Sequence, residues 1–253
     1  ASPLVPDASE PPALVDLACG LDHTLALDVD GRVWAAGRNT DGQLGVPTSG
    51  PSSGPVLHHV PLPLPARSIA AGGDVSGAVL ANGDVYLWGN DEYGQVLTGE
   101  RLFAVGEPRH ATKLPAHVAS LALGVHHGVA VTDDGMAFTW GWGGTPIDSL
   151  ADAERVSVGV THLESLSDVH TAAAGDHVSV FVTGSSHIHA YGLWGSAAHW
   201  ETPTGEIVLA DQRTPIALAD VAARVDDGAV WQNLILGDGH GFATFATPSA
   251  ARS

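Results

Sequence analysis

The sequence has little cysteine, little positive charge and no long apolar run. Cys19 is the single cysteine among 253 residues, so no disulfide can form within the chain and a disulfide-stabilised module is excluded. Lys113 is the one lysine, and ten basic residues stand against 28 acidic ones, a formal net charge of −18. A broad basic patch, which supplies most of the affinity of nucleic-acid binders, cannot form. No apolar run approaches the ~20 residues that span a bilayer, so we expect neither direct nucleic-acid binding nor a membrane span.

The start of the chain has no signal-type segment, and it opens with Ala1 instead of methionine. Removal of a presequence would explain this start and would indicate an organelle such as the mitochondrion, whereas a partial sequence explains it equally. The single cysteine argues against secretion. We therefore expect an intracellular protein, with the mitochondrion as one location.

Glycine is plentiful, with 31 residues, and it recurs in a pattern. The stretch LACGLDHTLALDVDGRVWAAGRNTDGQL aligns without a gap with IAAGGDVSGAVLANGDVYLWGNDEYGQV, which lies 52 residues later, and further copies follow at steps of 52, 51 and 53. The first glycines of the five copies are Gly20, Gly72, Gly124, Gly175 and Gly228. Five units with a period near 52 indicate a repeat architecture.

Each unit has the pattern of a β-hairpin. An aliphatic residue always stands seven positions after the first glycine, at Leu27, Val79, Val131, Val182 and Ile235. The turn position, mostly Asp-Gly or Asn-Gly, stands eleven positions after it, at Gly31, Gly83, Gly135, Ser186 and Gly239. Glycine there tolerates the positive φ of a tight hairpin turn. The second strand ends seventeen positions after the first glycine, at Gly37, Gly89, Gly141 and Gly192.

These hairpins predict an all-β protein, because no helical periodicity interrupts them. Small sheets repeated around an axis form a β-propeller, in which each blade buries a face on its neighbour. We expect a single propeller domain over residues 1–253, with units at about 14–65, 66–117, 118–168, 169–220 and 221–253. Eight residues follow Phe245, too few for the last strand of a fifth blade, and residues 1–13 could supply a closing strand. A closed five-blade ring, an incomplete propeller and a propeller completed by another chain stay open, and we favour the incomplete one.

Three motifs carry a resemblance to a known family. They are CGLDHTLAL at Cys19–Leu27, AAGRNTDGQLG at Ala35–Gly45 and LWGNDEYGQV at Leu87–Val96. Together they resemble the repeat of the regulator of chromosome condensation family, over about Asp16–Thr247. The resemblance implies a propeller in which a repeated histidine, here His23 and His127, forms a hydrogen bond within its own blade.

The family resemblance also suggests functions. The founding member exchanges guanine nucleotide on a small GTPase by means of an inserted β-wedge, but the even spacing here predicts no such insertion. Chromatin binding requires basic segments that this chain lacks. Photoreception, another precedent, uses a motif with tryptophan and arginine, whereas the nearest match, GVHHG at Gly124, has neither. Regulation of a small GTPase is therefore the alternative interpretation and not the favoured one.

Candidate enzyme and metal sites are weak. His187 and His189 share one face of a strand by alternation, but zinc requires three or four converging ligands and no third is indicated. The adjacent carboxylates Asp133–Asp134 fit a turn, and Cys19 is interpreted as a packed small residue. We expect no catalytic residue, metal or cofactor, and a metal-dependent enzyme is the second alternative.

Protein–protein interaction is the function favoured by elimination. We expect a non-catalytic scaffold or an accessory subunit of a larger assembly, since propellers present loops on a rigid frame. The segment Trp142–Asp168 departs most from the repeat, and a second departure, His199–Pro215, follows one unit later. A solvated variable connection explains both segments equally well. The expected partner-contact residues are Trp142, Asp148, Asp152, Glu154, Glu164, Asp168, Trp200 and Glu201.

Overall fold

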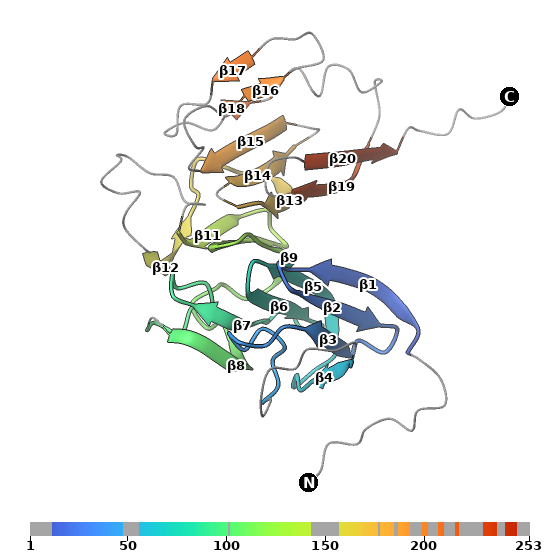
Figure 1. The fold of residues 1–253 in the computed structure, drawn as a ribbon. Helices are drawn as coiled ribbons and strands as arrows, with labels where there is room; N and C mark the ends of the chain where they lie inside the picture. Colours follow the sequence, from blue (N-terminus) through green and yellow to red (C-terminus); the bar gives the residue numbers. More distant parts are fainter. Residues whose placement is uncertain are drawn as a thin grey trace, which may run out of the picture.

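The computed structural model describes residues 12–47, 56–100, 102–142, 157–176, 178–184 and 187–192, together with five short strands between residues 199 and 246. Within these residues the chain is all β, with no helix, and accordingly no helix there has the length and apolarity that crossing a bilayer takes. The strands form four four-stranded antiparallel sheets, each from one stretch of the chain (Figure 1). We refer to these sheets as blades 1 to 4.

The blades follow one another in chain order. Blade 1 contains β1 (Leu14–Cys19), β2 (His23–Asp28), β3 (Val33–Gly37) and β4 (His58–Val60). Blade 2 contains β5 (Ala66–Gly72), β6 (Val75–Leu80), β7 (Val85–Asp91) and β8 (Leu102–His110). Blade 3 contains β9 (Val118–Leu123), β10 (His127–Thr132), β11 (Ala137–Gly141) and β12 (Ser157–His162). Blade 4 contains β13 (Val169–Ala174), β14 (Val178–Thr183), β15 (His187–Gly192) and β18 (Ile216–Ala217).

Two separate hairpins complete the described strands. β16 (His199–Glu201) pairs with β17 (Ile207–Leu209), and this hairpin is inserted between β15 and β18 of blade 4. The even repeat spacing did not indicate this hairpin. The connection between the third and fourth strands is long in several units, so the insertion leaves the repeat period unchanged. β19 (Val230–Leu236) pairs with β20 (Gly241–Ala246) and contacts β13 of blade 4.

The turn glycines connect each hairpin to the next blade. Gly31, Gly83 and Gly135 have φ of +78°, +85° and +78°, and a Cβ at Gly31 would lie 2.6 Å from the Cβ of Pro65. Their carbonyl oxygens accept hydrogen bonds from the first strand of the following blade, at Ala66 (2.8 Å), Val118 (3.2 Å) and Val169 (3.0 Å). The turn that glycine permits therefore also sets the position of the next sheet.

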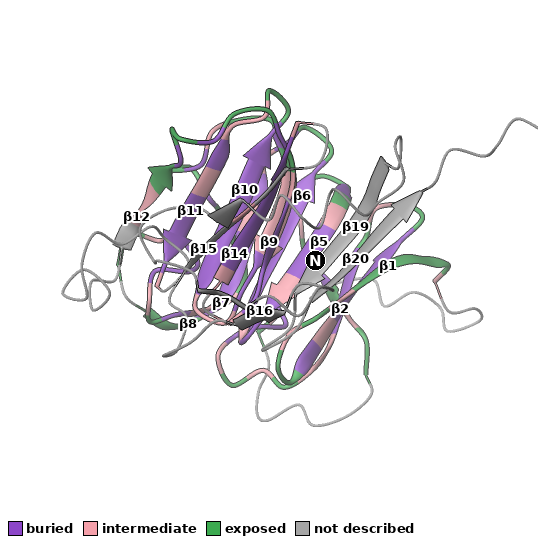
Figure 2. Ribbon diagram, turned by 90° about the horizontal axis from the view of Figure 1, so that it is seen from above, coloured by how far each residue is buried: buried purple, intermediate pink, exposed green. Residues whose placement is uncertain are grey.

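Apolar cores lie between successive blades, and most strand residues that face them are buried (purple in Figure 2). The core between blades 1 and 2 joins Leu25, Leu27, Val33 and Ala35 to Ala66, Ile69, Ala78, Leu80 and Trp88. The next two cores repeat this arrangement, with Val79, Val85 and Leu87 against Val118, Ala130 and Trp140, and with Val129, Val131 and Ala137 against Val169, Ala172 and Phe181. Sheets that each bury one face on the following sheet form a propeller-type array.

The first strands of the blades line a common axis. β1 contacts β5, β5 contacts β9, and β9 contacts β13. This arrangement confirms the prediction of an all-β propeller. The described strands do not close a ring, because Leu14 and Leu17 of β1 are exposed.

Candidate functional site

A buried hydrogen bond between a histidine and a serine joins blade 1 to blade 2, and we call such a histidine–serine pair a latch. The Nε2 of His23, at the start of β2, lies 2.8 Å from the Oγ of Ser76 in β6. The Ser76 hydroxyl donates to the carbonyl oxygen of Gln43 at 2.8 Å, and the indole Nε1 of Trp88 donates to the same oxygen at 2.9 Å. Because Ser76 uses its proton on Gln43, the hydrogen between His23 and Ser76 must sit on Nε2.

The imidazole of His23 is neutral at physiological pH. Burial lowers the pKa of His23 from 6.5 to about 4, with the nearby Asp22 carboxylate acting in the opposite direction. Its Nδ1 is buried and has no hydrogen-bond partner, so a proton added there would go unpaired. The latch therefore exists in one protonation state.

The same latch recurs between blades 3 and 4. The Nε2 of His127 lies 3.0 Å from the Oγ of Ser179. The counterpart of the Trp88 bond lies instead between blades 2 and 3, where the Nε1 of Trp140 donates to the carbonyl oxygen of Gln95 at 2.8 Å. The prediction that these histidines bond within their own blades is wrong: each reaches the blade that follows, 53 and 52 residues away in sequence.

The interface between blades 2 and 3 has an apolar pair in place of the latch. Val75 stands in the histidine position and Gly128 in the serine position. The ring of Trp140 occupies the space that a side chain at residue 128 would need, since a Cβ there would lie 2.3 Å from the ring. A hydroxyl is therefore present at the two interfaces where a histidine faces it, and is missing where the facing residue is valine.

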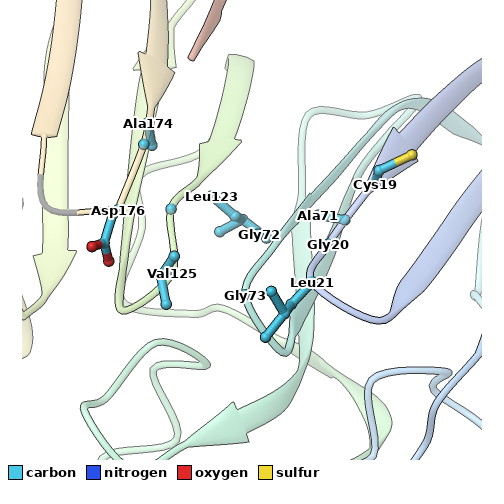
Figure 3. Close-up of a pocket in the computed structure, with 12 residues that line it drawn as sticks. Cys19, Gly20, Leu21, Ala71, Gly72, Gly73, Leu123, Val125, Ala174 and Asp176 are labelled. Atoms are coloured by element: carbon cyan, nitrogen blue, oxygen red, sulfur yellow. The ribbon is translucent and has the colours of Figure 1, made fainter. Parts of the chain in front are cut away.

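A cavity of about 390 Å³ lies at the axis where the first strands end (Figure 3). The turns that begin at Gly20, Gly72, Gly124 and Gly175 line it, with apolar side chains and one carboxylate, that of Asp176. Cys19 also lines the cavity and is exposed. The interpretation of Cys19 as a packed residue is therefore wrong, because no described strand covers β1 on that side.

Three aromatic rings gather beside this cavity. Tyr93 follows β7, His126 lies between β9 and β10, and Trp142 follows β11. The ring centroids are 4.8 Å apart for Tyr93 and His126, and 5.4 Å apart for the other two pairs. The Nδ1 of His126 lies 3.8 Å from a carboxylate oxygen of Asp176, in blade 4. All three rings are part-exposed. We name these four residues the aromatic cluster, and the end of the blades that carries them the loop face.

The loop face of blades 1 and 2 carries a second group of charges. Arg38 pairs with Asp22 at 3.1 Å, and the side-chain amide of Gln43 donates to Asp74 at 2.8 Å. Burial and the neighbouring carboxylate of Asp41 raise the pKa of Asp74. Carboxylates thus outnumber the one guanidinium in this group, in keeping with the net charge of the chain.

The structure places one of the predicted contact residues in the aromatic cluster, Trp142. The segment Trp142–Asp168 was predicted as one connection, but Ser157–His162 within it forms β12. Glu164 and Asp168 are exposed and lie at the opposite end of blade 3, beside the turn of Gly135. They cannot share a contact with Trp142 at one small site.

The other predicted contacts are less fully described. Asp148, Asp152 and Glu154 lie outside the described residues. Trp200 and Glu201 belong to β16. Of the two histidines weighed as metal ligands, His189 lies in β15 with its Nε2 3.0 Å from the hydroxyl of Thr183. Among the described side chains, no three histidine, cysteine, aspartate or glutamate residues converge as a metal site would require.

Sequence reasoning missed Tyr93, His126 and Asp176. They come from different positions of three successive units, so alignment of the repeats does not bring them together. It also missed a periodic aromatic–histidine pair between the third and fourth strands. The pairs are Trp34 with His59, Tyr86 with His110 and Phe138 with His162. That signal was available, because these histidines recur at steps of 51 and 52.

Blades stacked about an axis and latched to one another define a propeller-type repeat protein. Models of the regulator of chromosome condensation repeat match residues 14–43 and 30–79. Residues 14–79 therefore carry the regulator of chromosome condensation repeat that the motifs predicted.

Relatives of known name cover parts of the chain. The Ultraviolet-B receptor UVR8 of Arabidopsis thaliana is 32% identical over 126 residues, which is 50% of this chain and 29% of the receptor. The Probable E3 ubiquitin-protein ligase HERC4 of Homo sapiens is 29% identical over 191 residues, 72% of this chain and 18% of the ligase. The chain thus spans less than a third of the length of these relatives. The crystal structure of human WBSCR16 shares the fold, with a TM-score of 0.71 at 21% identity, over 94% of this chain and 59% of that one.

Proposed function

We propose that this protein is a non-catalytic interaction platform whose loop face docks a basic segment of a protein partner. The observation that carries the proposal is the aromatic cluster, in which three part-exposed rings and a carboxylate meet from three successive blades. Aromatic side chains in such clusters are typical anchors of protein interfaces. Repeat proteins of this family act in protein interaction or regulation, in agreement with this role.

The charge of the chain favours a basic partner. A net charge of −18 steers cationic segments towards the protein and repels acidic ones. An arginine side chain can stack on the Trp142 or Tyr93 ring and pair with the Asp176 carboxylate at the same time. Stacking of a guanidinium on an aromatic face contributes about 0.5–2 kcal/mol, more when water is excluded.

The frame that holds the cluster is rigid. Gln95, two residues after Tyr93, accepts two hydrogen bonds. Its side-chain oxygen accepts one from the backbone N–H of Tyr93 at 2.8 Å, and its backbone carbonyl oxygen accepts one from the indole N–H of Trp140. The backbone N–H of Trp142 donates to the carbonyl oxygen of His126 at 2.8 Å. A preorganised surface loses little conformational entropy on binding.

Binding of an arginine-rich peptide, measured by fluorescence anisotropy at about 0.15 M ionic strength, tests the proposal. Trp142→Ala should weaken binding about ten-fold or more. Phe103→Ala is the matched control, since Phe103 is exposed on β8 and makes none of the ring contacts of the cluster. Equal loss in both variants, or no difference between the arginine peptide and its citrulline counterpart, would contradict the proposal.

Regulation of a small GTPase is the second candidate function. The hairpin of β16 and β17, inserted in blade 4, is the observation that favours it, because the family precedent for exchange is an inserted β-element. A nucleotide-release assay against a panel of small GTPases decides this point. Faster nucleotide release from one of the GTPases would support exchange activity, and unchanged release across the panel would rule out this candidate function. No observation on the described residues favours a metal-dependent enzyme.

A further inference from the structure

The cavity at the axis, which we call the axial cavity, and the aromatic cluster form one continuous surface. Asp176 belongs to both, because it lines the cavity and its carboxylate oxygen lies 3.8 Å from the Nδ1 of His126. Val125, another lining residue, directly precedes His126 in the chain. An extended chain advances about 3.3–3.6 Å per residue. A peptide segment bound to the aromatic cluster therefore reaches the axial cavity with its next few residues.

The walls of the axial cavity suit an apolar side chain. Leu21, which is 71% exposed, lies on one side, and Val125 lies on the other (Figure 3). Gly73 stands in the repeat position of these two residues, and a Cβ there would lie 2.6 Å from the carbonyl oxygen of Val125. Because this position has no side chain in blade 2, the space between the two apolar walls stays open.

The size and charge of the axial cavity narrow the choice of occupant. Its volume of about 390 Å³ is near the lower end of the roughly 300–1,000 Å³ of clefts that bind small molecules, so it suits a large side chain better than a large cofactor. Asp176 is the one charged side chain among its described lining residues, and it lies on the side of the aromatic cluster. An aliphatic group with a cation next to it fits this lining.

The geometry of the aromatic cluster selects the type of cation. Its rings contact one another, with centroids 4.8 to 5.4 Å apart, and Tyr93 and Trp142 are stacked with planes 22° apart. A rounded ammonium group has no space between these rings. A planar guanidinium stacks on an exposed ring face and still pairs with a carboxylate, so the cluster favours arginine.

We propose that the partner segment carries a large aliphatic residue and an arginine about two positions apart, with the aliphatic side chain in the axial cavity and the guanidinium on the aromatic cluster. This inference rests on the proposed function and names the motif that the site would recognise. A spacing of two directs both side chains to the same side of an extended segment. The carboxylates of Asp22, Asp41 and Asp74 on the same loop face disfavour an acidic residue beside the motif.

Four labelled peptides test the motif by fluorescence anisotropy. They carry leucine or serine at one position and arginine or citrulline two residues later, in an otherwise glycine–serine sequence. Leucine should tighten binding about ten-fold relative to serine, because it buries apolar surface in the cavity. Leu21→Ala should remove most of this advantage. Leu64→Ala is the matched control and should keep it, since Leu64 is 44% exposed and lies beside the turn of Gly31, at the other end of the blades.

The two peptide positions separate this inference from the proposed function. Equal binding of the arginine and citrulline peptides would contradict the proposed function, and the motif with it. A clear preference for arginine without any preference for leucine would overturn the motif alone. A leucine advantage that survives in Leu21→Ala, or that falls equally in Leu64→Ala, would overturn it too.

Cys19 provides a second readout that needs no substitution. It is the single cysteine of the chain, is exposed and lines the axial cavity. Labelled with a trifluoroacetonyl group, it should show a larger change of its fluorine NMR shift with the leucine–arginine peptide than with the serine–arginine peptide. Equal changes with both peptides, or no change with either, would place the leucine elsewhere and overturn the proposal.

Discussion

The latch between His23 and Ser76 makes a quantitative prediction about stability. Ser76→Ala leaves the Nε2–H of His23 buried without an acceptor, since His23 is 3% and Ser76 0% exposed. An unsatisfied buried donor destabilises a protein by about 1–3 kcal/mol. We expect that loss in the free energy of unfolding, measured by urea titration with tryptophan fluorescence, to which Trp88 in the same interface contributes.

A double-mutant cycle separates the pair from its two members. His23→Val combined with Ser76→Ala resembles the apolar pair of Val75 and Gly128 between blades 2 and 3, so the double variant should recover part of the loss. We expect a coupling energy of about 1 kcal/mol or more. Thr112→Ala, at an exposed threonine, is the control and should change stability by less than about 0.5 kcal/mol. Strictly additive single losses would refute the latch.

Three further predictions follow from the same interfaces. The pKa of His23 is lowered from 6.5 to about 4 in the fold, so the folded state binds fewer protons than the unfolded chain between these pH values. The free energy of unfolding should therefore be highest above pH 6.5 and fall by roughly 3 kcal/mol towards pH 4. Unfolding of His23→Val, measured over the same pH range, should lack this loss. Trp140→Phe removes the indole donor to Gln95 while keeping most of the apolar packing, and should lower the free energy of unfolding by about 1 kcal/mol. Urea titration measures this loss, and an unchanged free energy of unfolding would contradict the prediction. Gly31→Ala places a Cβ against Pro65 at positive φ and should lower the thermal midpoint, whereas Gly106→Ala, where a Cβ meets nothing within 4 Å, should change it little.

The sequence predicted the repeat, the hairpins and their turns, because these depend on local geometry. Gly31 and Gly83 stand where a tight turn requires positive φ, and the period places the same turn in each unit. The propeller follows from the period together with the hairpin pattern, since a hairpin with one apolar face must cover it with the next copy.

The interactions between blades could not be read in the same way. His23 and Ser76 stand at neighbouring positions of two different units, so the repeat alignment shows both residues but not the contact between them. The aromatic cluster combines four positions from three units, and it exists because its residues all lie at one end of the blades. The β16–β17 hairpin was hidden because it lies within a connection that other units also have.

Hydrogen–deuterium exchange on the native complex tests the central claim, that the loop face is the surface a protein partner covers. Exchange is compared between the isolated chain and the chain in complex with its co-purifying partner. We predict slower exchange in the complex for the amides around Tyr93 and His126, with no change around the turn of Gly135 at the opposite end. Protection confined to that opposite end, or unchanged exchange at the aromatic cluster, would contradict the account.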